Sequence, residues 1–254
     1  MKKVTYLLCS LLFIIFISGL GSAQTMNKDA VKPFNDGLAK SKKGDYKGAL
    51  ADFENALKSD KDYRIYYQIG FADMKLKNTD DAIQNFQNAI KANPKFDAAY
   101  NDLGNVYYSL GKYQDAINNF EKVLTLSKDE TTNKQVKFNL ALSYTNLAST
   151  AENDKDLKKA SSLLNKAVSY DNYDYAYLSL ARIYYQDSKY NQAISAGFKA
   201  LKYKKNIGDG GPDYYIGASY AQKNEVKKAK EYLNKAKSDP VYKSYSETIL
   251  KALQ

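Results

Sequence analysis

The chain has 254 residues, and its 38 lysines and arginines outnumber 28 aspartates and glutamates, which gives a formal charge of +10. It contains no histidine and a single cysteine, Cys9, so a zinc site, a Cys/His nucleophilic pair or a Ser-His-Asp triad cannot be built from it. We therefore expect neither an enzyme nor a bound metal or cofactor, and the basic charge favours anionic partners.

The first 23 residues have the pattern of a secretory signal peptide. Lys2 and Lys3 give a positive start, residues 7–20 are mostly apolar, and residues 21–23 are the small residues that a signal peptidase requires. A membrane span needs about 20 apolar residues, so we predict cleavage before Gln24, with an uncleaved anchor as the alternative. Cys9 lies too early in the apolar stretch for lipidation.

An exported protein, periplasmic or secreted, would not meet nucleic acid, which is therefore not an expected partner. Residues 24–29 carry no periodic apolar pattern, and we predict a flexible leader there.

The rest of the chain repeats one pattern, which is clearest at residues 100–123. Two stretches with apolar residues three or four apart flank Gly111, and the pattern residues are Tyr100, Leu103, Gly104, Tyr107, Ala116, Phe120 and Val123. This spacing lines one face of an α-helix, and a glycine between the stretches suits a helix end. The pattern predicts a helical hairpin, which needs copies on both sides to bury its apolar faces.

Copies recur at a nearly constant step. The second-helix pattern begins at Ala49, Ala82, Ala116, Ala160, Ala193 and Ala229, at steps of 33, 34, 44, 33 and 36 residues. A first-helix pair precedes each copy, at Ile69-Gly70, Leu103-Gly104, Leu140-Ala141, Leu180-Ala181 and Ile216-Gly217, with Gly37 alone in the first. These residues resemble the tetratricopeptide repeat family over about residues 30 to 240. The resemblance implies an all-α fold, a right-handed α-α superhelix whose first helices line a concave groove for a partner.

We place six repeats at residues 30–62, 63–96, 97–133, 134–173, 174–209 and 210–240, and a C-terminal capping helix at 241–254. With Leu140-Ala141 as the first-helix pair of the fourth repeat, seven extra residues fall at 148–154. We expect both helices of that hairpin to grow by one turn. Insertions of this kind often contact partners, and a neutral insertion is the alternative.

In the fifth repeat, Gly197 stands where the pattern has a large residue, and Phe198 follows it. We therefore expect looser packing against the sixth repeat. The glycines at 206–212 predict a loop and not a phosphate cradle, because no Gly-Lys-Ser/Thr follows and no strand precedes them.

The family resemblance assigns the groove to side chains that lie between the packing positions of the first helices. Mapped onto this chain, the candidate partner-binding residues are Tyr67, Phe71, Asn101, Asn105, Tyr108, Phe138, Leu142, Thr145, Asn146, Tyr175, Leu178, Arg182, Tyr185 and Tyr214. This aromatic and amide-rich lining suits an extended peptide or a helix of another protein. The alternative is that the chain's 24 tyrosines merely coat its surface.

Lysines gather on the second helices and in the C-terminal half, at Lys199, Lys202, Lys204, Lys205, Lys227, Lys228, Lys230, Lys235 and Lys237. The expected function is a non-enzymatic adaptor of the cell envelope that binds another protein in its groove. The alternative is that the lysine-rich outer face binds anionic glycans or lipid headgroups, and a solvated face without a partner is a further possibility. The identity of the partner and the oligomeric state stay open.

Overall fold

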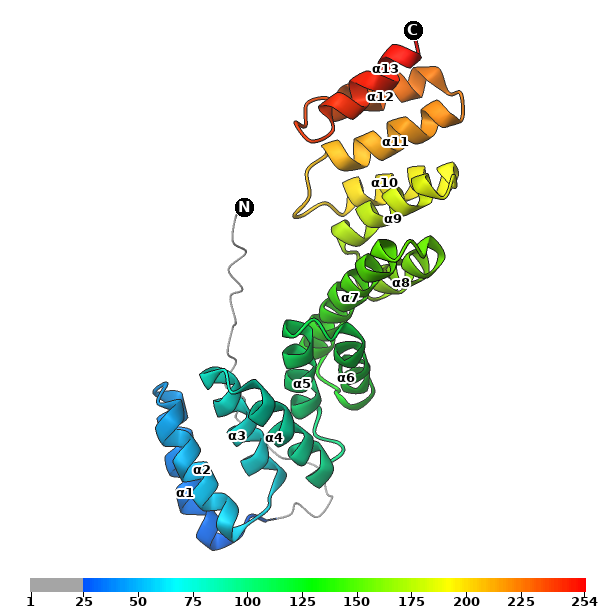
Figure 1. The fold of residues 1–254 in the computed structure, drawn as a ribbon. Coiled ribbons are helices and arrows are strands. Elements are labelled where there is room, and N and C mark those ends of the chain that lie inside the picture. Colours follow the sequence, from blue (N-terminus) through cyan, green and yellow to red (C-terminus); the bar gives the residue numbers. More distant parts are fainter. Residues whose placement is uncertain (1–24) are drawn as a thin grey trace.

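The computed structural model describes residues 25–254 (Figure 1), so the predicted signal peptide and its cleavage site lie outside the described residues. Within this range 79% of residues are helical and none forms a strand, which confirms the all-α prediction. The helices are α1 (Lys28–Lys42), α2 (Tyr46–Ser59), α3 (Tyr63–Leu76), α4 (Thr79–Ala92), α5 (Asp97–Ser109), α6 (Tyr113–Leu126), α7 (Glu130–Asn153), α8 (Leu157–Tyr170), α9 (Asp174–Gln186), α10 (Tyr190–Lys202), α11 (Gly210–Gln222), α12 (Val226–Ala236) and α13 (Lys243–Ala252).

The helices pack as consecutive pairs, from α1 with α2 to α11 with α12, and each pair packs on the next in chain order (Figure 1). Helix α13 covers the last pair by packing on α12 and α11. The predicted right-handed solenoid with a C-terminal capping helix is confirmed. Between residues 25 and 254, no helix combines the length and the apolar character needed to cross a bilayer.

Inside a pair, a small residue of the first helix meets a large residue of the second. A Cβ atom added to Gly104 would lie 2.7 Å from the ring of Phe120, and one added to Gly37 would lie 2.6 Å from the ring of Phe53. Both rings are at most 1% exposed. The two helices of a pair can approach this closely because the first offers no side chain at the contact.

The turn inside each pair is also constant. Five positions before each second-helix alanine, one residue takes a left-handed conformation with φ between 57° and 81°; these residues are Gly44, Lys77, Gly111, Lys155, Ser188 and Asn224. The next backbone N–H donates back across the turn, as in Lys112 to the Tyr107 carbonyl and Asp156 to the Ala151 carbonyl, both at 2.9 Å. The fourth repeat therefore has an ordinary turn.

The register predicted for the fourth repeat was wrong. Ala148 precedes Ala160 by 12 positions and Leu164 by 16, the spacings that separate Gly104 from Ala116 and Phe120. Its first-helix pair is thus Leu147-Ala148 and not Leu140-Ala141. The expectation that both helices grow by a turn also fails, because α8 has 14 residues, like α6, whereas α7 has 24 against the 13 of α5.

The additional residues of α7 lie at its N-terminal end, ahead of the hairpin. Val136 and Leu140 on this extension are fully buried in the hydrophobic cluster that also contains Phe120 and Val123 of α6. Further along α7, the Tyr144 hydroxyl donates to Glu121 of α6 at 2.8 Å. The extension therefore lengthens the contact between the third and fourth repeats.

The flexible leader predicted at residues 24–29 is too long. Helix α1 begins at Lys28, because Asn27 caps it by accepting a hydrogen bond from the Asp29 N–H at 3.0 Å. The Asn27 N–H also donates to Asp60 at 2.7 Å, and Met26 packs against the buried cluster that contains Phe53 and Ile65. Lys28 and Asp29 belong to the fold.

The expected loose packing after the fifth repeat is also wrong. A Cβ on Gly197 would lie 2.6 Å from Cγ1 of Ile216 and 3.3 Å from the carbonyl oxygen of Pro212, both on α11. Ile216 fills the space that a large residue occupies in other second helices. The loop before α11 ends at Asp209 and is anchored by Asp174, whose carboxylate accepts three backbone N–H groups; these belong to Lys205, Asn206 and Ile207.

We predict that Gly197→Leu, which restores the repeat pattern, destabilises the protein. The new side chain would overlap Ile216, and overpacking of this kind costs about 1–3 kcal/mol of unfolding free energy. Urea unfolding followed by circular dichroism measures the effect. Gly208→Ala is the control, because the nearest atom to its Cβ is at 3.7 Å, and equal stability of Gly197→Leu and the native chain would contradict the packing described for α11.

Candidate functional site

The candidate partner-binding residues lie on the first helices α3, α5, α7, α9 and α11, whose outward side chains we call the first-helix face. Several of these side chains join neighbouring repeats by hydrogen bonds. The pairs are Tyr67 hydroxyl to Asp102 at 2.8 Å, Asn139 amide to Asn105 at 3.3 Å, and Asn146 amide to the Tyr108 hydroxyl at 3.1 Å. These polar groups hold consecutive first helices in register.

Asp102 is the residue of this network that the sequence reading missed. Burial raises the pKa of its carboxyl group, and the hydroxyl of Tyr67 and the amide of Asn101 oppose that rise by donating hydrogen bonds to it. The Tyr67 ring packs against Phe86 and Phe96, with ring centroids 5.8 Å and 5.0 Å apart. The Tyr67 side chain is thus part of the interface between repeats two and three.

The corrected register changes the positions assigned to the fourth repeat. Phe138 lies on the N-terminal extension of α7, where its ring is 5.8 Å from Tyr173. The positions that match Tyr175, Leu178, Arg182 and Tyr185 of α9 lie 33 residues earlier, and they are Leu142, Thr145, Ser149 and Glu152. Sequence reading missed Ser149 and Glu152, although the 12-residue spacing from Ala148 to Ala160 could have identified them.

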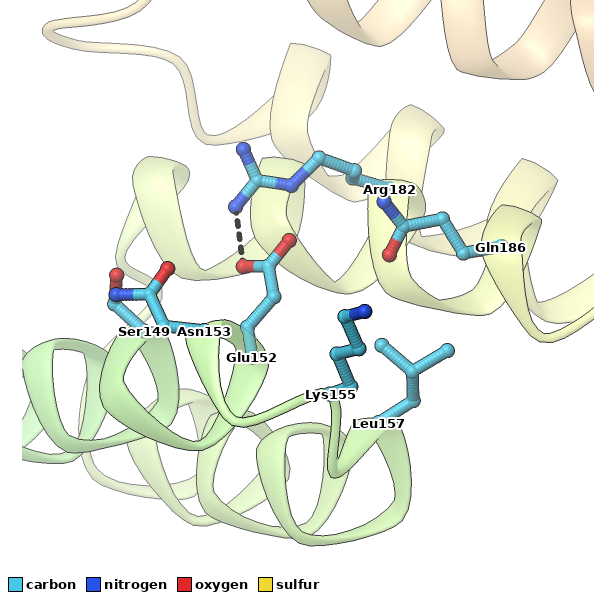
Figure 2. A pocket seen from close by; sticks show the side chains of 7 residues that line it. All are labelled: Ser149, Glu152, Asn153, Lys155, Leu157, Arg182 and Gln186. Carbon is cyan, nitrogen blue, oxygen red and sulfur yellow. Dashed lines mark hydrogen bonds and ion pairs between the residues drawn. The ribbon is translucent and has the colours of Figure 1, made fainter.

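These two residues line a pocket between repeats four and five. Figure 2 shows Ser149, Glu152 and Asn153 at the end of α7 opposite Arg182 and Gln186 of α9, with Lys155 and Leu157 below them. The pocket has a volume of about 580 Å³. A second hollow of about 230 Å³ shares Ser149, Glu152 and Arg182 with it, and its other lining residues are Thr145, Asn146, Ala148, Leu164, Tyr173, Tyr175 and Ser179.

An ion pair spans this site. The Arg182 guanidinium donates to Glu152 at 2.7 Å, as the dashed line in Figure 2 marks. Its Nε is buried and finds no acceptor among the described residues. A buried donor without a partner costs free energy. The site offers hydroxyl, amide and guanidinium groups, which suit binding.

The end of the first-helix face is occupied by aromatic packing. Tyr214 of α11 has its ring 5.3 Å from Tyr242 and 6.0 Å from Tyr245, so the capping segment covers it. Tyr185 packs 6.0 Å from Tyr215. Among the aromatic candidates, Tyr175 stays 43% exposed at the edge of the smaller hollow.

The stacked helix pairs define the chain as a helical-repeat protein, and a polar pocket lies between two of its repeats. Models of the tetratricopeptide repeat match residues 98–130 and 141–174, and a further TPR repeat model matches residues 70–111. The chain belongs to the tetratricopeptide repeat family, whose members generally mediate protein–protein interactions. The match at 141–174 contains Leu147-Ala148 but not Leu140, which agrees with the corrected register.

Curated relatives match parts of larger proteins. Neutrophil cytosol factor 2 of Mus musculus is 33% identical over 97 residues, which is 38% of this chain and 18% of the relative. DnaJ homolog subfamily C member 7 of Homo sapiens is 27% identical over 202 residues, which is 77% of this chain and 34% of the relative. The chain thus spans about a third or less of the length of these relatives.

Solved structures share the fold. The C-terminal part of a TPR repeat-containing protein from Cytophaga hutchinsonii has a TM-score of 0.57 and 19% identity, and the alignment covers 87% of each chain. YrrB, described as a TPR protein with an unusual peptide-binding site, has a TM-score of 0.51 and 21% identity over 77% of this chain and 97% of its own. At these identities the likeness concerns the fold alone.

The tyrosines at the end of the first-helix face predict a loss of stability at alkaline pH. Burial raises the pKa of Tyr214, Tyr215 and Tyr242 above the usual value in the folded state. Above pH about 10 the unfolded chain releases these protons while the folded chain keeps them, so the unfolding free energy falls as pH rises further. Urea unfolding at pH 8 to 11 measures the slope.

The triple variant Tyr214→Phe/Tyr215→Phe/Tyr242→Phe should show a shallower fall over the same pH range. The control is Tyr245→Phe, since this residue is 61% exposed. A slope that the triple substitution leaves unchanged would contradict this origin of the pH dependence.

Proposed function

We propose that the chain is a non-enzymatic scaffold of the cell envelope that holds a peptide segment of a partner protein on its first-helix face. The supporting observation is the pocket between repeats four and five, where the groove positions Ser149, Glu152 and Arg182 meet. Its lining combines polar groups with the exposed ring of Tyr175, and family members bind proteins.

The chemistry of this pocket favours an extended peptide. An extended segment carries unpaired backbone N–H and C=O groups, which need polar partners when they leave water. The hydroxyls of Ser149 and Ser179 and the partly exposed guanidinium of Arg182 can pair with them without reading the sequence of the peptide. A tyrosine beside them adds apolar contact area at a small entropic cost.

Other parts of the first-helix face are less available. Tyr67, Asn105 and Tyr108 already bond to neighbouring repeats, and Tyr214 is covered by the capping segment. A partner that bound there would have to replace contacts that stabilise the solenoid. The pocket beside Tyr175 is therefore the anchor we assign to the partner.

The envelope location rests on residues 1–23, whose composition is that of a cleavable signal peptide. We expect the protein isolated from its native cell to begin at Gln24. Intact-mass spectrometry measures this, and a mass that includes Met1 would contradict the cleavage.

Ser149→Arg tests the pocket. The new side chain fills the hollow from an exposed position on α7, so the protein should still fold but the peptide can no longer bind in the pocket. Blocking a central anchor costs at least about 1.4 kcal/mol, and we expect the variant to recover roughly tenfold less of each partner from envelope extract. Quantitative mass spectrometry after pull-down measures the recovery.

The matched control is Ser195→Arg, the same substitution on an exposed position of α10. It should recover partners like the native chain. Equal recovery by Ser149→Arg and Ser195→Arg, with both variants folded by circular dichroism, would overturn the assignment of the pocket.

A further inference from the structure

The net positive charge of residues 25–254 comes from the C-terminal part of the chain. Residues 25–156 hold 19 basic and 19 acidic residues and are neutral in balance. Residues 157–254, from α8 to the end, hold 17 basic and 9 acidic residues, a balance of +8. Any partner selected by charge alone would therefore meet α8 to α13.

Three of these lysines occupy one position of the repeat. Lys166 of α8, Lys199 of α10 and Lys235 of α12 each lie six residues after the second-helix alanine, and all three are exposed. We call them the lysine row. Because equivalent positions of a solenoid repeat line up, the row crosses the three second helices along the array. The same position holds Asn55 and Asn88 in the first two repeats and Lys122 in the third.

Each ammonium group of the row lies over a tyrosine ring. The distances from Nζ to the ring centroid are 5.5 Å for Lys166 over Tyr144, 5.7 Å for Lys199 over Tyr177, and 4.4 Å for Lys235 over Tyr232; these contacts are cation–π interactions. The rings restrict the lysine side chains, so less conformational entropy would be lost when an anion binds.

Few acidic groups compete for the row. Lys235 pairs with Glu231 at 2.9 Å, whereas Lys166 and Lys199 have no ion pair among the described residues. Two further carboxylates of this part are engaged elsewhere. Asp174 accepts backbone N–H groups of the loop after α10, and Glu225 pairs with two lysines, Lys223 and Lys228.

We propose that the lysine row binds an acidic polysaccharide that runs along the solenoid across α8, α10 and α12. The repeat supplies one ordered ammonium group per unit, which suits a linear chain whose carboxylate or sulfate groups also recur. Such a flexible chain can follow helices that turn about a superhelical axis, whereas a flat bilayer would touch only part of the row.

The tyrosine rings also favour a polysaccharide over a single-stranded nucleic acid. Nucleic-acid binding of that kind uses free aromatic faces on which bases stack. Here Tyr144 stacks on Tyr170 at 5.8 Å and Tyr177 on Tyr203 at 5.7 Å, and lysines cover Tyr144 and Tyr177 as well. The lysine row therefore offers ammonium groups but no uncovered aromatic faces at Tyr144 and Tyr177.

The lysine row shares no residue with the two hollows assigned to the peptide. Since no side chain serves both surfaces, one chain could hold a protein partner and an acidic polymer together. Its test does not depend on the peptide pocket.

The test measures binding of the full-length chain to fluorescein-labelled polygalacturonate by fluorescence anisotropy. We expect Lys166→Gln/Lys199→Gln/Lys235→Gln to bind roughly tenfold more weakly, and the slope of log affinity against log salt to become shallower by about 2, because three contacts release fewer counterions. The variant Lys166→Arg/Lys199→Arg/Lys235→Arg keeps the charge and should retain most of the affinity.

The control is Lys47→Gln/Lys58→Gln/Lys95→Gln, which removes the same charge from exposed lysines in the neutral part. It should change the affinity less than about twofold, because these lysines lie outside the row and salt screens charges beyond about 10 Å. Equal losses of affinity in the two Gln variants would overturn the assignment of binding to the lysine row. Tighter binding to oligo-dT or to phosphatidylglycerol vesicles than to polygalacturonate would overturn the polysaccharide.

Discussion

The architecture depends on one contact, made inside every helix pair but the fifth between a small residue of the first helix and a large residue 16 positions later. Gly37, Gly70, Gly104 and Gly217 each leave room for a ring or a leucine that an added Cβ would strike within 3 Å. Because this contact fixes how closely the two helices approach, it also fixes which of their faces remain for the neighbouring pair. A stacked array follows from repeating it.

The fifth repeat shows that the contact can be remade by other residues. Gly197 replaces the large residue of the second helix, and Ile216 of the next repeat occupies the space. The interior stays close-packed because a side chain from a neighbouring helix can fill the gap as well as one from the same pair. The fourth repeat keeps its hairpin and places its additional turns ahead of it, where Val136 and Leu140 bury them against α6.

The first-helix face serves stability and binding at once. Polar groups that could meet a partner instead form hydrogen bonds between repeats, as buried polar groups must. Tyr67 bonds to Asp102, and Asn105 bonds to Asn139. Between repeats four and five the corresponding link is an ion pair, and a pocket opens around Arg182 and Glu152. The neighbouring first helices carry similar side chains. The pocket differs from them because its polar groups are still accessible to a partner.

The sequence by itself determined the helical hairpins, their number and their order, because apolar spacing and turn residues act within about 34 positions. It also identified most of the first-helix face, since those positions follow from the repeat. The structure corrected the register of the fourth repeat, where Leu140-Ala141 and Leu147-Ala148 both fit the first-helix pair and the turn at Lys155 places Leu147-Ala148 opposite Ala160. It also decided that Ile216 fills the space beside Gly197 and that Tyr67 binds Asp102. These contacts join residues of different repeats, whose approach no local pattern encodes.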